Sequence, residues 1–120
     1  MKGTVLVADD EPTIRELLHA VLTDEGFEVV LATNGQQALT AIESTRPDVV
    51  LMDVMMPVLD GREAVRQIAN LPEDVRPRIV MMSAAMSISQ DEPHVSLFLS
   101  KPFDLDRLLE AVESLLDRRS

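Results

Sequence analysis

Residues 4–12 of the chain read TVLVADDEP, from Thr4 to Pro12. The first five form an apolar run rich in β-branched residues and without polar alternation, which is typical of a strand buried on both faces. Pro12 suits the first turn of a helix, where no backbone N–H is needed, and Asp10 or Glu11 is expected to cap that helix. The stretch therefore predicts a buried strand that passes directly into a helix, with carboxylates at the junction.

The same alternation of apolar runs and helical patterns continues along the chain. Further strands are expected at Glu28–Ala32, Asp48–Asp53, Arg78–Ser83 and Val95–Leu99. The helical patterns have apolar positions spaced for one buried face: Ile14, Leu17, Leu18, Val21 and Leu22; Ala38, Leu39 and Ile42; Ala64, Val65 and Ile68; Leu105, Leu108, Leu109, Val112, Leu115 and Leu116. Asn34 and Asp104 are the expected caps of the second and last helices. The segment 84–96 is polar and broken by Pro93, so we expect a short or irregular fourth helix.

Repeated strand–helix alternation with unbroken apolar strands indicates an α/β fold, in which a parallel sheet is covered by helices on both faces. With 120 residues and no linker, the chain is expected to form one domain. Right-handed crossovers bring the carboxyl ends of all strands to one edge of such a sheet, where ligands bind. The polar residues at those ends are therefore the candidate functional residues.

Composition excludes several classes of function. The chain has no cysteine, which excludes disulfides, thiolate metal sites and cysteine nucleophiles. Its 11 basic and 21 acidic residues give a net charge of -10 without a basic run, so we expect no direct binding to nucleic acid and no membrane insertion. Three phenylalanines are the only aromatic residues, too few to stack bases or a flavin. Without a signal peptide, the expected location is cytoplasmic.

Five polar residues fall at the expected strand ends: Asp9, Asp10, Asp53, Ser83 and Lys101. Taken singly, each has a structural explanation, such as a helix cap or a solvated lysine. Together they place three carboxylates at one edge, where they repel one another unless a cation joins them. Oxygen ligands with room for water suit Mg²⁺. A carboxylate can also form an aspartyl phosphate, with the lysine and the hydroxyl group facing the phosphoryl oxygens.

These motifs resemble the receiver domain of bacterial two-component response regulators. The resemblance is carried, in family order, by Asp9-Asp10, by 53–57 (DVMMP) with Asp60-Gly61, by Ser83-Ala84 and by 101–103 (KPF). It implies that residues 1–120 form one chemotaxis-regulator-like receiver domain without an effector domain. It also implies a flavodoxin-like fold, with five parallel strands in the order 2-1-3-4-5.

By the same resemblance, Asp53 is the residue that accepts a phosphoryl group from a sensor histidine kinase or a histidine phosphotransfer protein. Asp10, Asp53 and the backbone carbonyl of Met55 then bind Mg²⁺ directly, and Asp9 acts largely through a water molecule. The domain catalyses only its own phosphorylation and dephosphorylation, and we expect it to be a signalling switch and not an enzyme in the usual sense.

The resemblance further assigns Ser83, Ala84 and Lys101 to the phosphoryl oxygens and Phe98 to the switch aromatic, and implies a cis bond before Pro102. The expected output is control of a downstream protein or of a tethered effector domain. Since the segment 87–94 offers little apolar surface for pairing, we expect a monomer more than a dimer.

Three other functions fit the fold class less well. A haloacid-dehalogenase-type phosphatase needs a second aspartate two residues after the nucleophile, where this chain has Met55. A flavodoxin-like FMN carrier needs a phosphate loop after the first strand, where carboxylates stand instead. A pseudo-receiver that acts without phosphate remains an alternative, although no acceptor residue is missing. The sequence also leaves open whether the chain acts alone or comes from a longer protein.

Overall fold

A computed structural model describes residues 2–56, 58–59, 61–83, 95–101 and 104–117. Within these residues the chain alternates between strands and helices, as the sequence predicts. The strands are β1 (Thr4–Ala8), β2 (Glu28–Ala32), β3 (Val49–Asp53), β4 (Arg78–Ser83) and β5 (Leu97–Ser100). The helices are α1 (Pro12–Asp24), α2 (Gly35–Thr45), α3 (Gly61–Ala69) and α4 (Leu105–Asp117).

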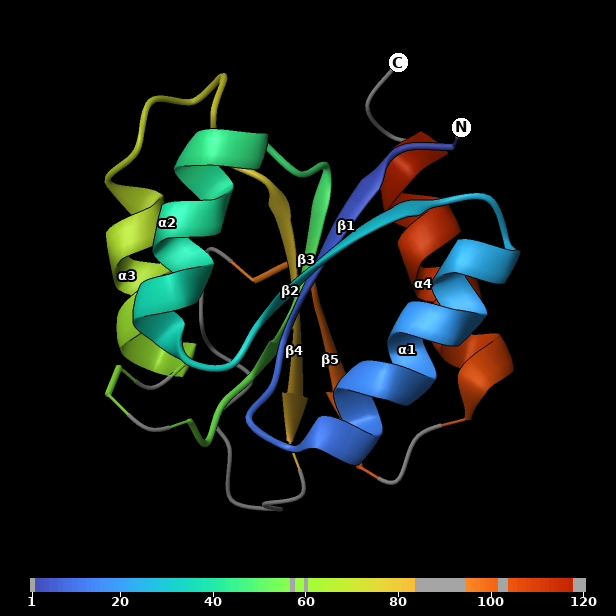
Figure 1. The fold of residues 1–120 in the computed structure, drawn as a ribbon. Helices are drawn as coiled ribbons and strands as arrows, with labels where there is room; N and C mark the ends of the chain where they lie inside the picture. The colour runs from blue at the N-terminus through green and yellow to red at the C-terminus, as the bar shows by residue number, and fades with distance from the viewer. Residues whose placement is uncertain (1, 57, 60, 84–94, 102–103, 118–120) are drawn as a thin grey trace.

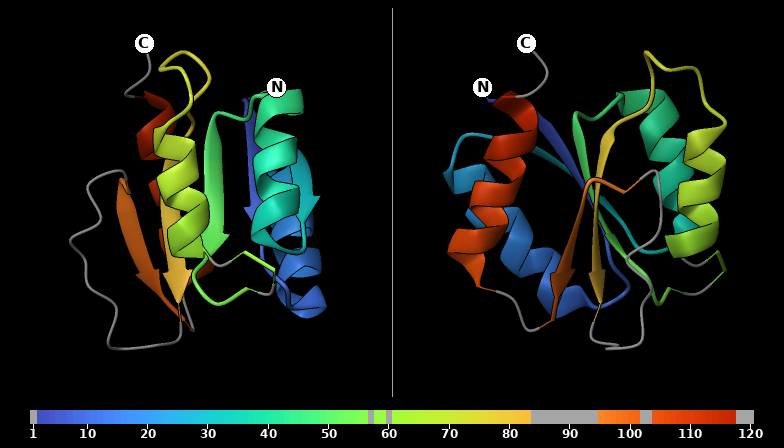
Figure 2. Two further views of the ribbon diagram at one scale, coloured as in Figure 1. Left: turned by 90° about the vertical axis from the view of Figure 1, so that its left-hand side faces the viewer. Right: turned by 180° about the vertical axis from the view of Figure 1, so that it is seen from behind.

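The five strands form one parallel sheet in the order β2-β1-β3-β4-β5, which confirms the predicted flavodoxin-like topology. Helices α2 and α3 cover one face of the sheet, and α1 and α4 cover the other (Figures 1 and 2). The expected short or irregular fourth helix falls mostly on residues 84–94, which lie outside the described residues. The helix labelled α4 is thus the last of the helices expected from the sequence.

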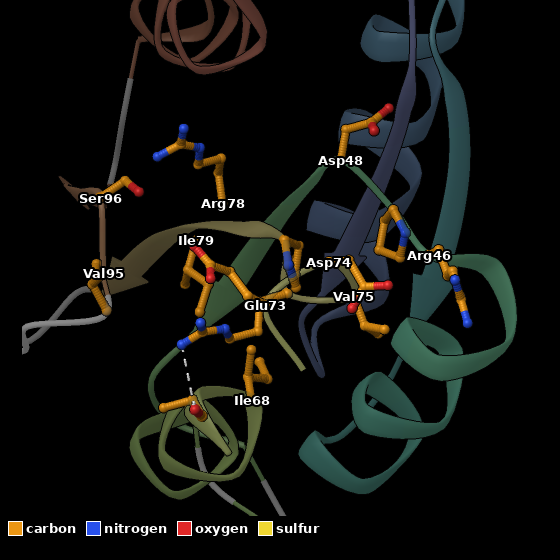
Figure 3. Close-up of a pocket in the computed structure, with 14 residues that line it drawn as sticks. Arg46, Asp48, Ile68, Glu73, Asp74, Val75, Arg78, Ile79, Val95 and Ser96 are labelled. Atoms are coloured by element: carbon orange, nitrogen blue, oxygen red, sulfur yellow. Dashed lines mark hydrogen bonds between the residues drawn. The ribbon is translucent and has the colours of Figure 1, made fainter. Parts of the chain in front are cut away.

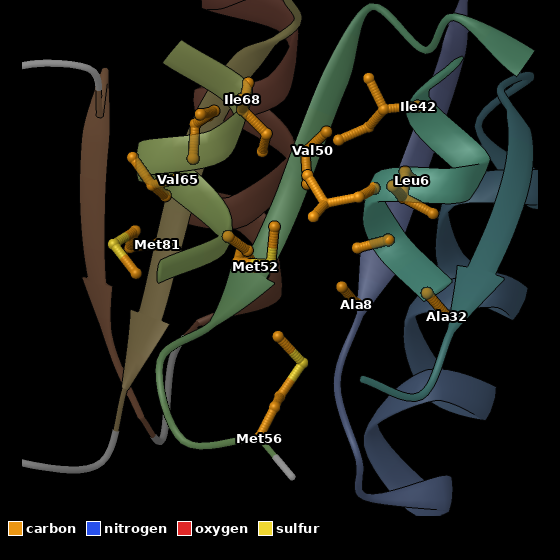
Figure 4. Close-up of a cluster of buried hydrophobic side chains, with 14 of the residues drawn as sticks. Leu6, Ala8, Ala32, Ile42, Val50, Met52, Met56, Val65, Ile68 and Met81 are labelled. Carbon is orange, nitrogen blue, oxygen red and sulfur yellow. The ribbon is translucent and has the colours of Figure 1, made fainter. Parts of the chain in front are cut away.

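The sheet separates two apolar clusters, because successive residues of a strand point to opposite faces. On the α2 and α3 side, Leu6, Val50, Met52 and Met81 of the strands pack against residues such as Ile68 (Figure 4). We call this group the α2/α3 cluster. On the α1 and α4 side, the alternate strand residues pack against the two other helices: Val5, Val7, Leu51, Val80 and Met82. Both faces of the three central strands are therefore buried, which explains their unbroken apolar sequences.

Local predictions differ from the structure at several places. Leu17, expected on the buried face of α1, is 41% exposed, whereas Leu18 and Leu22 of the same stripe are fully buried. Neither expected acidic residue caps α1 through its side chain; Glu11 occupies the cap position, but its side chain accepts no hydrogen bond from the N–H groups of the helix. The third strand begins at Val49 and not at Asp48, and the fifth runs from Leu97 to Ser100 and not from Val95 to Leu99, as the pairing with β4 shows.

None of the helices in the described part of the chain has both the length and the apolar character that crossing a membrane requires.

The start of α2 is joined to the loop that follows β3. The side chain of Asn34 caps the helix by accepting a hydrogen bond from the Gln37 N–H at 2.8 Å, as predicted. The Gly35 N–H donates to the carbonyl oxygen of Leu59 at 3.0 Å. A Cβ at Gly35 would collide with that carbonyl oxygen, so the close approach requires glycine. This contact fixes one side of the loop that connects Asp53 to α3.

We therefore expect Gly35→Ala to destabilise the protein by about 2 kcal/mol or more, although alanine is the better helix former. The added methyl group must push the backbone of Leu59 away. Urea unfolding followed by circular dichroism measures the change. Gln36→Ala, at an exposed position in the same turn, is the matched control and should change stability by no more than about 0.5 kcal/mol. Equal effects of the two substitutions would contradict the packing argument.

Candidate functional site

The carboxyl ends of four strands bring the predicted polar residues together. Asp9 follows β1, Asp53 and Ser83 end β3 and β4, and Lys101 follows β5. The parallel register places the end of β1 beside β3, then β4, then β5, so these ends form a continuous edge. In Figure 1 this edge lies at the lower end of the sheet, where the arrowheads of β4 and β5 point. The topology therefore confirms the predicted juxtaposition of strand ends.

The turn between β1 and α1 holds Asp9 in one orientation. The Asp9 side chain is fully buried, and its Oδ1 accepts a hydrogen bond from the Glu11 N–H at 3.0 Å. Arg15, in the first turns of α1, donates from Nη1 to the Asp9 carbonyl oxygen at 2.8 Å. The carboxylate and the backbone of Asp9 are thus both fixed by the start of the helix. Asp10, the next residue, is exposed.

Lys101 places its ammonium group among three carboxylates. The Nζ atom lies 2.7 Å from Oδ2 of Asp9, 3.4 Å from Oδ2 of Asp53 and 3.5 Å from Oε1 of Glu11. Its backbone N–H donates to the Ser83 carbonyl oxygen at 2.7 Å, which continues the β4–β5 ladder and sets where the side chain starts. Burial alone would lower the pKa of Lys101, but the hydrogen bond to Asp9 and the charges of Asp53 and Asp9 raise it. The ammonium group is therefore a permanent positive charge in the site.

Asp53 is buried at the end of the central strand and carries an unfavourable charge. Its side chain is only 6% exposed. Burial, and then repulsion from Asp9, raise the pKa of Asp53 to about 6, against the opposing effects of Lys101 and the Met55 N–H. That N–H donates to Oδ1 of Asp53 at 3.3 Å. Ionisation of Asp53 is therefore less favourable than that of an ordinary aspartate.

The acidic group at this edge has the composition of a site for a hard cation. Asp9, Asp10, Glu11 and Asp53 each offer a carboxylate oxygen, and these oxygens lie within 4.8 Å of one another. Because all four donors are oxygen and two of the residues are exposed to water, the arrangement fits Mg²⁺ with retained water ligands. The sequence pattern predicts Glu11 only as a helix cap. The signal that could have found it is the run of three acidic residues directly after a buried strand.

The remaining predicted residues lie around this group. Ser83 is buried at the end of β4. Met55, whose backbone carbonyl is a predicted metal ligand, stands 69% exposed in the loop after β3. Phe98 is half-buried on β5, beside Met81, and packs against the α2/α3 cluster and not against the carboxylates. The predictions for Ala84 and Pro102 fall outside the described residues.

A depression of about 740 Å³ lies at the opposite end of the strands. Figure 3 shows Arg46, Asp48, Glu73 and Arg78 among its lining residues. Arg78 begins β4, and Asp48 directly precedes β3, so this depression is at the amino ends of the strands. Its lining mixes basic and acidic side chains without the clustering seen around Lys101. The carboxylate edge is therefore the stronger candidate for the functional site.

Comparison with known proteins places this chain in one family. The family model of the response regulator receiver domain matches residues 5–113. The response regulator MprA of Mycolicibacterium vanbaalenii is 40% identical over 122 residues, which cover 98% of this chain and 52% of that protein. MprA of Mycobacterium tuberculosis H37Ra is 38% identical with the same coverage. The chain thus spans about half the length of the curated relatives it matches.

Solved structures agree with this assignment. The receiver domain of the Francisella response regulator 1452 superimposes with a TM-score of 0.87 at 27% identity, covering 98% of this chain and 99% of that one. The receiver domain of the sensor histidine kinase PA1611 from Pseudomonas aeruginosa gives 0.84 at 28% identity, covering 96% and 98%, and was crystallised with a magnesium ion in its active site cleft. The family match, these relatives and the carboxylate edge lead to one conclusion: the chain belongs to the response regulator receiver domains of two-component systems.

Proposed function

We propose that this domain is cytoplasmic and accepts a phosphoryl group on Asp53 from a sensor histidine kinase or a histidine phosphotransfer protein. The observation that carries the proposal is the contact of Lys101 with both buried aspartates, at 2.7 Å from Asp9 and 3.4 Å from Asp53. Asp53 ends a central strand and is held by the Met55 N–H, so its carboxylate has a fixed direction. A fixed carboxylate beside a fixed positive charge suits attack on a phosphoryl group whose charge must be neutralised.

In the proposed step, a carboxylate oxygen of Asp53 attacks phosphorus and forms a new O–P bond. The bond from phosphorus to the donor's imidazole nitrogen breaks, and that nitrogen keeps the electron pair. The product is an acyl phosphate on Asp53. The Lys101 ammonium, already 3.4 Å from Oδ2 of Asp53, is placed to donate to an oxygen of the transferred group. Ser83, buried at the neighbouring strand end, is the proposed hydroxyl donor to a second oxygen.

Asp9, Asp10 and Asp53, with the backbone carbonyl of Met55, are the proposed magnesium ligands, Asp9 acting largely through water. When bound, Mg²⁺ offsets the charge of the carboxylates and of the phosphoryl oxygens. The cluster of carboxylate oxygens and the raised pKa of Asp53 support this assignment, because both mark a site whose negative charge Lys101 only partly offsets. The same arrangement argues against a pseudo-receiver, which has no need to bring these carboxylates together.

The proposed output runs from Ser83 to Phe98 through the paired ends of β4 and β5. Movement of Ser83 toward the phosphoryl group opens space beside β5, into which the half-buried Phe98 ring can turn. This rearrangement changes the exposed surface of β5, the outermost strand on this side of the sheet, and we propose that the partner contacts this surface. The partner is a downstream protein or a tethered effector domain; the relatives that are about twice as long as this chain support the second form.

The acceptor assignment predicts that Asp53→Asn abolishes phosphorylation while the fold remains intact. Asparagine is nearly isosteric with aspartate, but its amide is not a nucleophile for phosphorus. Intact-protein mass spectrometry after incubation with acetyl phosphate and Mg²⁺ should show the mass of one phosphoryl group on wild type and none on the variant. Asp74→Asn removes the charge of an exposed loop carboxylate and should leave uptake unchanged. Normal uptake by Asp53→Asn would refute the assignment.

The metal assignment predicts that millimolar Mg²⁺ raises the melting temperature of wild type and raises that of Asp10→Ala much less. A cation that binds only the folded protein must stabilise it, and Asp10 is a proposed direct ligand. Thermal unfolding with and without Mg²⁺ measures both shifts. Asp74→Ala, which removes one carboxylate far from the cluster in sequence, should show the wild-type shift. Equal shifts in all three proteins would mean that Mg²⁺ only screens surface charge.

The raised pKa of Asp53 predicts an unusual dependence of stability on pH in the metal-free protein. Between the ordinary pKa of 3.8 and the folded value of about 6, the folded state binds more protons than the unfolded state. The contribution of Asp53 to the free energy of unfolding should therefore fall by roughly 2 to 3 kcal/mol as pH rises from 4 to 6. Above pH 6 this contribution should stay level.

Urea unfolding in EDTA across this pH range tests the effect, with Asp53→Asn as reference. The difference in stability between the variant and wild type should grow from pH 4 to pH 6. A constant difference would show that Asp53 ionises as an ordinary carboxyl group. Asp74→Asn again serves as the exposed control and should parallel wild type throughout.

A further inference from the structure

Glu11 contacts the same ammonium group as the two buried aspartates, although the proposed phosphoryl transfer assigns it no part. Its Oε1 lies 3.5 Å from Nζ of Lys101, and its side chain is 60% exposed. The backbone on both sides is fixed: the Glu11 N–H donates to Asp9 Oδ1 at 3.0 Å, and its carbonyl oxygen accepts from the Arg15 N–H at 3.1 Å. The side chain therefore extends from a rigid point over the edge of the site toward Lys101.

The three contacts of Lys101 use all the hydrogens of its ammonium group, because a lysine ammonium has three donors. A phosphoryl oxygen that arrives at Asp53 can be bound by Lys101 only if one of these contacts is given up. Asp9 is fully buried, and losing its partner at 2.7 Å would leave a carboxylate unpaired in the interior. Glu11 has the longest contact and is the most exposed, so water can replace its partner at little cost.

We propose that Glu11 is a positioning residue that holds Lys101 in the unphosphorylated domain and competes with the incoming phosphoryl group for it. This inference rests on the proposed phosphorylation of Asp53 and adds a control on its rate. Glu11 keeps the ammonium group tied at the β1–α1 turn and must release it before the acyl phosphate is stabilised. Loss of the contact should therefore speed phosphorylation about two- to fivefold, the effect expected of an exposed ion pair.

The contrary role for Glu11 is that of a metal ligand, since its carboxylate belongs to the group of oxygens within 4.8 Å of one another. The two roles predict opposite changes in the rate of phosphorylation when Glu11 is substituted. Removing a metal ligand weakens Mg²⁺ binding and slows phosphorylation, whereas removing a competitor for Lys101 speeds it. The sign of the rate change therefore distinguishes them.

The rate experiment compares Glu11→Gln, Glu11→Asp and Glu16→Gln with wild type. Glu11→Gln removes the charge at constant length, and Glu11→Asp keeps the charge but shortens the side chain, so that it no longer reaches Lys101. Glu16→Gln makes the same change in net charge at an exposed position of α1. Initial uptake from dilute acetyl phosphate is followed by intact-protein mass at the Mg²⁺ concentration that half-saturates wild type, so that weaker metal binding would slow the reaction.

Both Glu11 variants should exceed the wild-type rate, Glu11→Gln by two- to fivefold, and Glu16→Gln should match wild type. A slower rate in Glu11→Gln would identify a metal ligand and overturn the proposal. If Glu11→Asp stays at the wild-type rate while Glu11→Gln is faster, charge repulsion alone acts, and the competition for Lys101 is also refuted.

A second measurement needs neither phosphoryl donor nor metal. Lys2 and Lys101 are the only lysines of the chain, so nitrogen-15 NMR of the side-chain ammonium groups gives two signals. Hydrogens of the Lys101 ammonium should exchange with water faster in both Glu11 variants than in wild type. Lys2, which pairs with Glu25 and Glu113, is the internal control and should not change.

If the Lys101 ammonium hydrogens exchange with water at the wild-type rate in both variants, the proposal that Glu11 holds Lys101 is overturned. Failure of the proposed function is recognised separately, because wild type and Glu16→Gln would then also gain no phosphoryl group on Asp53, whatever the NMR result.

Discussion

The ion pair between Lys101 and Asp9 is the interaction on which the functional edge of this domain depends. It joins residues 92 positions apart at 2.7 Å, with Asp9 completely buried and the Lys101 side chain 11% exposed. Two buried carboxylates, Asp9 and Asp53, would otherwise face each other without a counter-charge. Removing one member of such a buried pair costs about 3 to 5 kcal/mol, because the other charge stays unpaired. The lysine thus makes the acidic edge compatible with folding.

The same ion pair leaves the negative charge of the site only partly neutralised. This excess of negative charge favours the binding of a cation. One ammonium group faces three carboxylates, and the pKa of Asp53 stays high despite its contact with Lys101. If every carboxylate were fully paired, the site would gain little free energy from binding a cation. A divalent cation bound among these carboxylates would relieve part of this imbalance and would stabilise the folded domain.

The two apolar clusters of the core support the strand ends that form this edge. The two apolar clusters lie on opposite faces of the sheet, and the three central strands take part in both. Each strand therefore ends at a position set by packing on two sides, and the functional groups stand on rigid supports. The loop after Asp53 is fixed in turn by the Gly35 contact with Leu59. The core thus sets where each strand ends, and hydrogen bonds from the following turns then orient the side chains of Asp9 and Asp53.

The sequence by itself determined the element order, the parallel sheet and the strand ends at Asp9, Asp53, Ser83 and Lys101, because unbroken apolar runs and turn residues are local signals. It could not decide which helix positions are covered: Leu17 fits the apolar stripe of α1 but stays exposed, since coverage depends on where the neighbouring sheet ends. Nor could it assign Glu11 a partner. Only the tertiary structure brings Lys101 within 3.5 Å of that side chain, because a contact across 90 residues is set by the packing of strands and not by any local pattern.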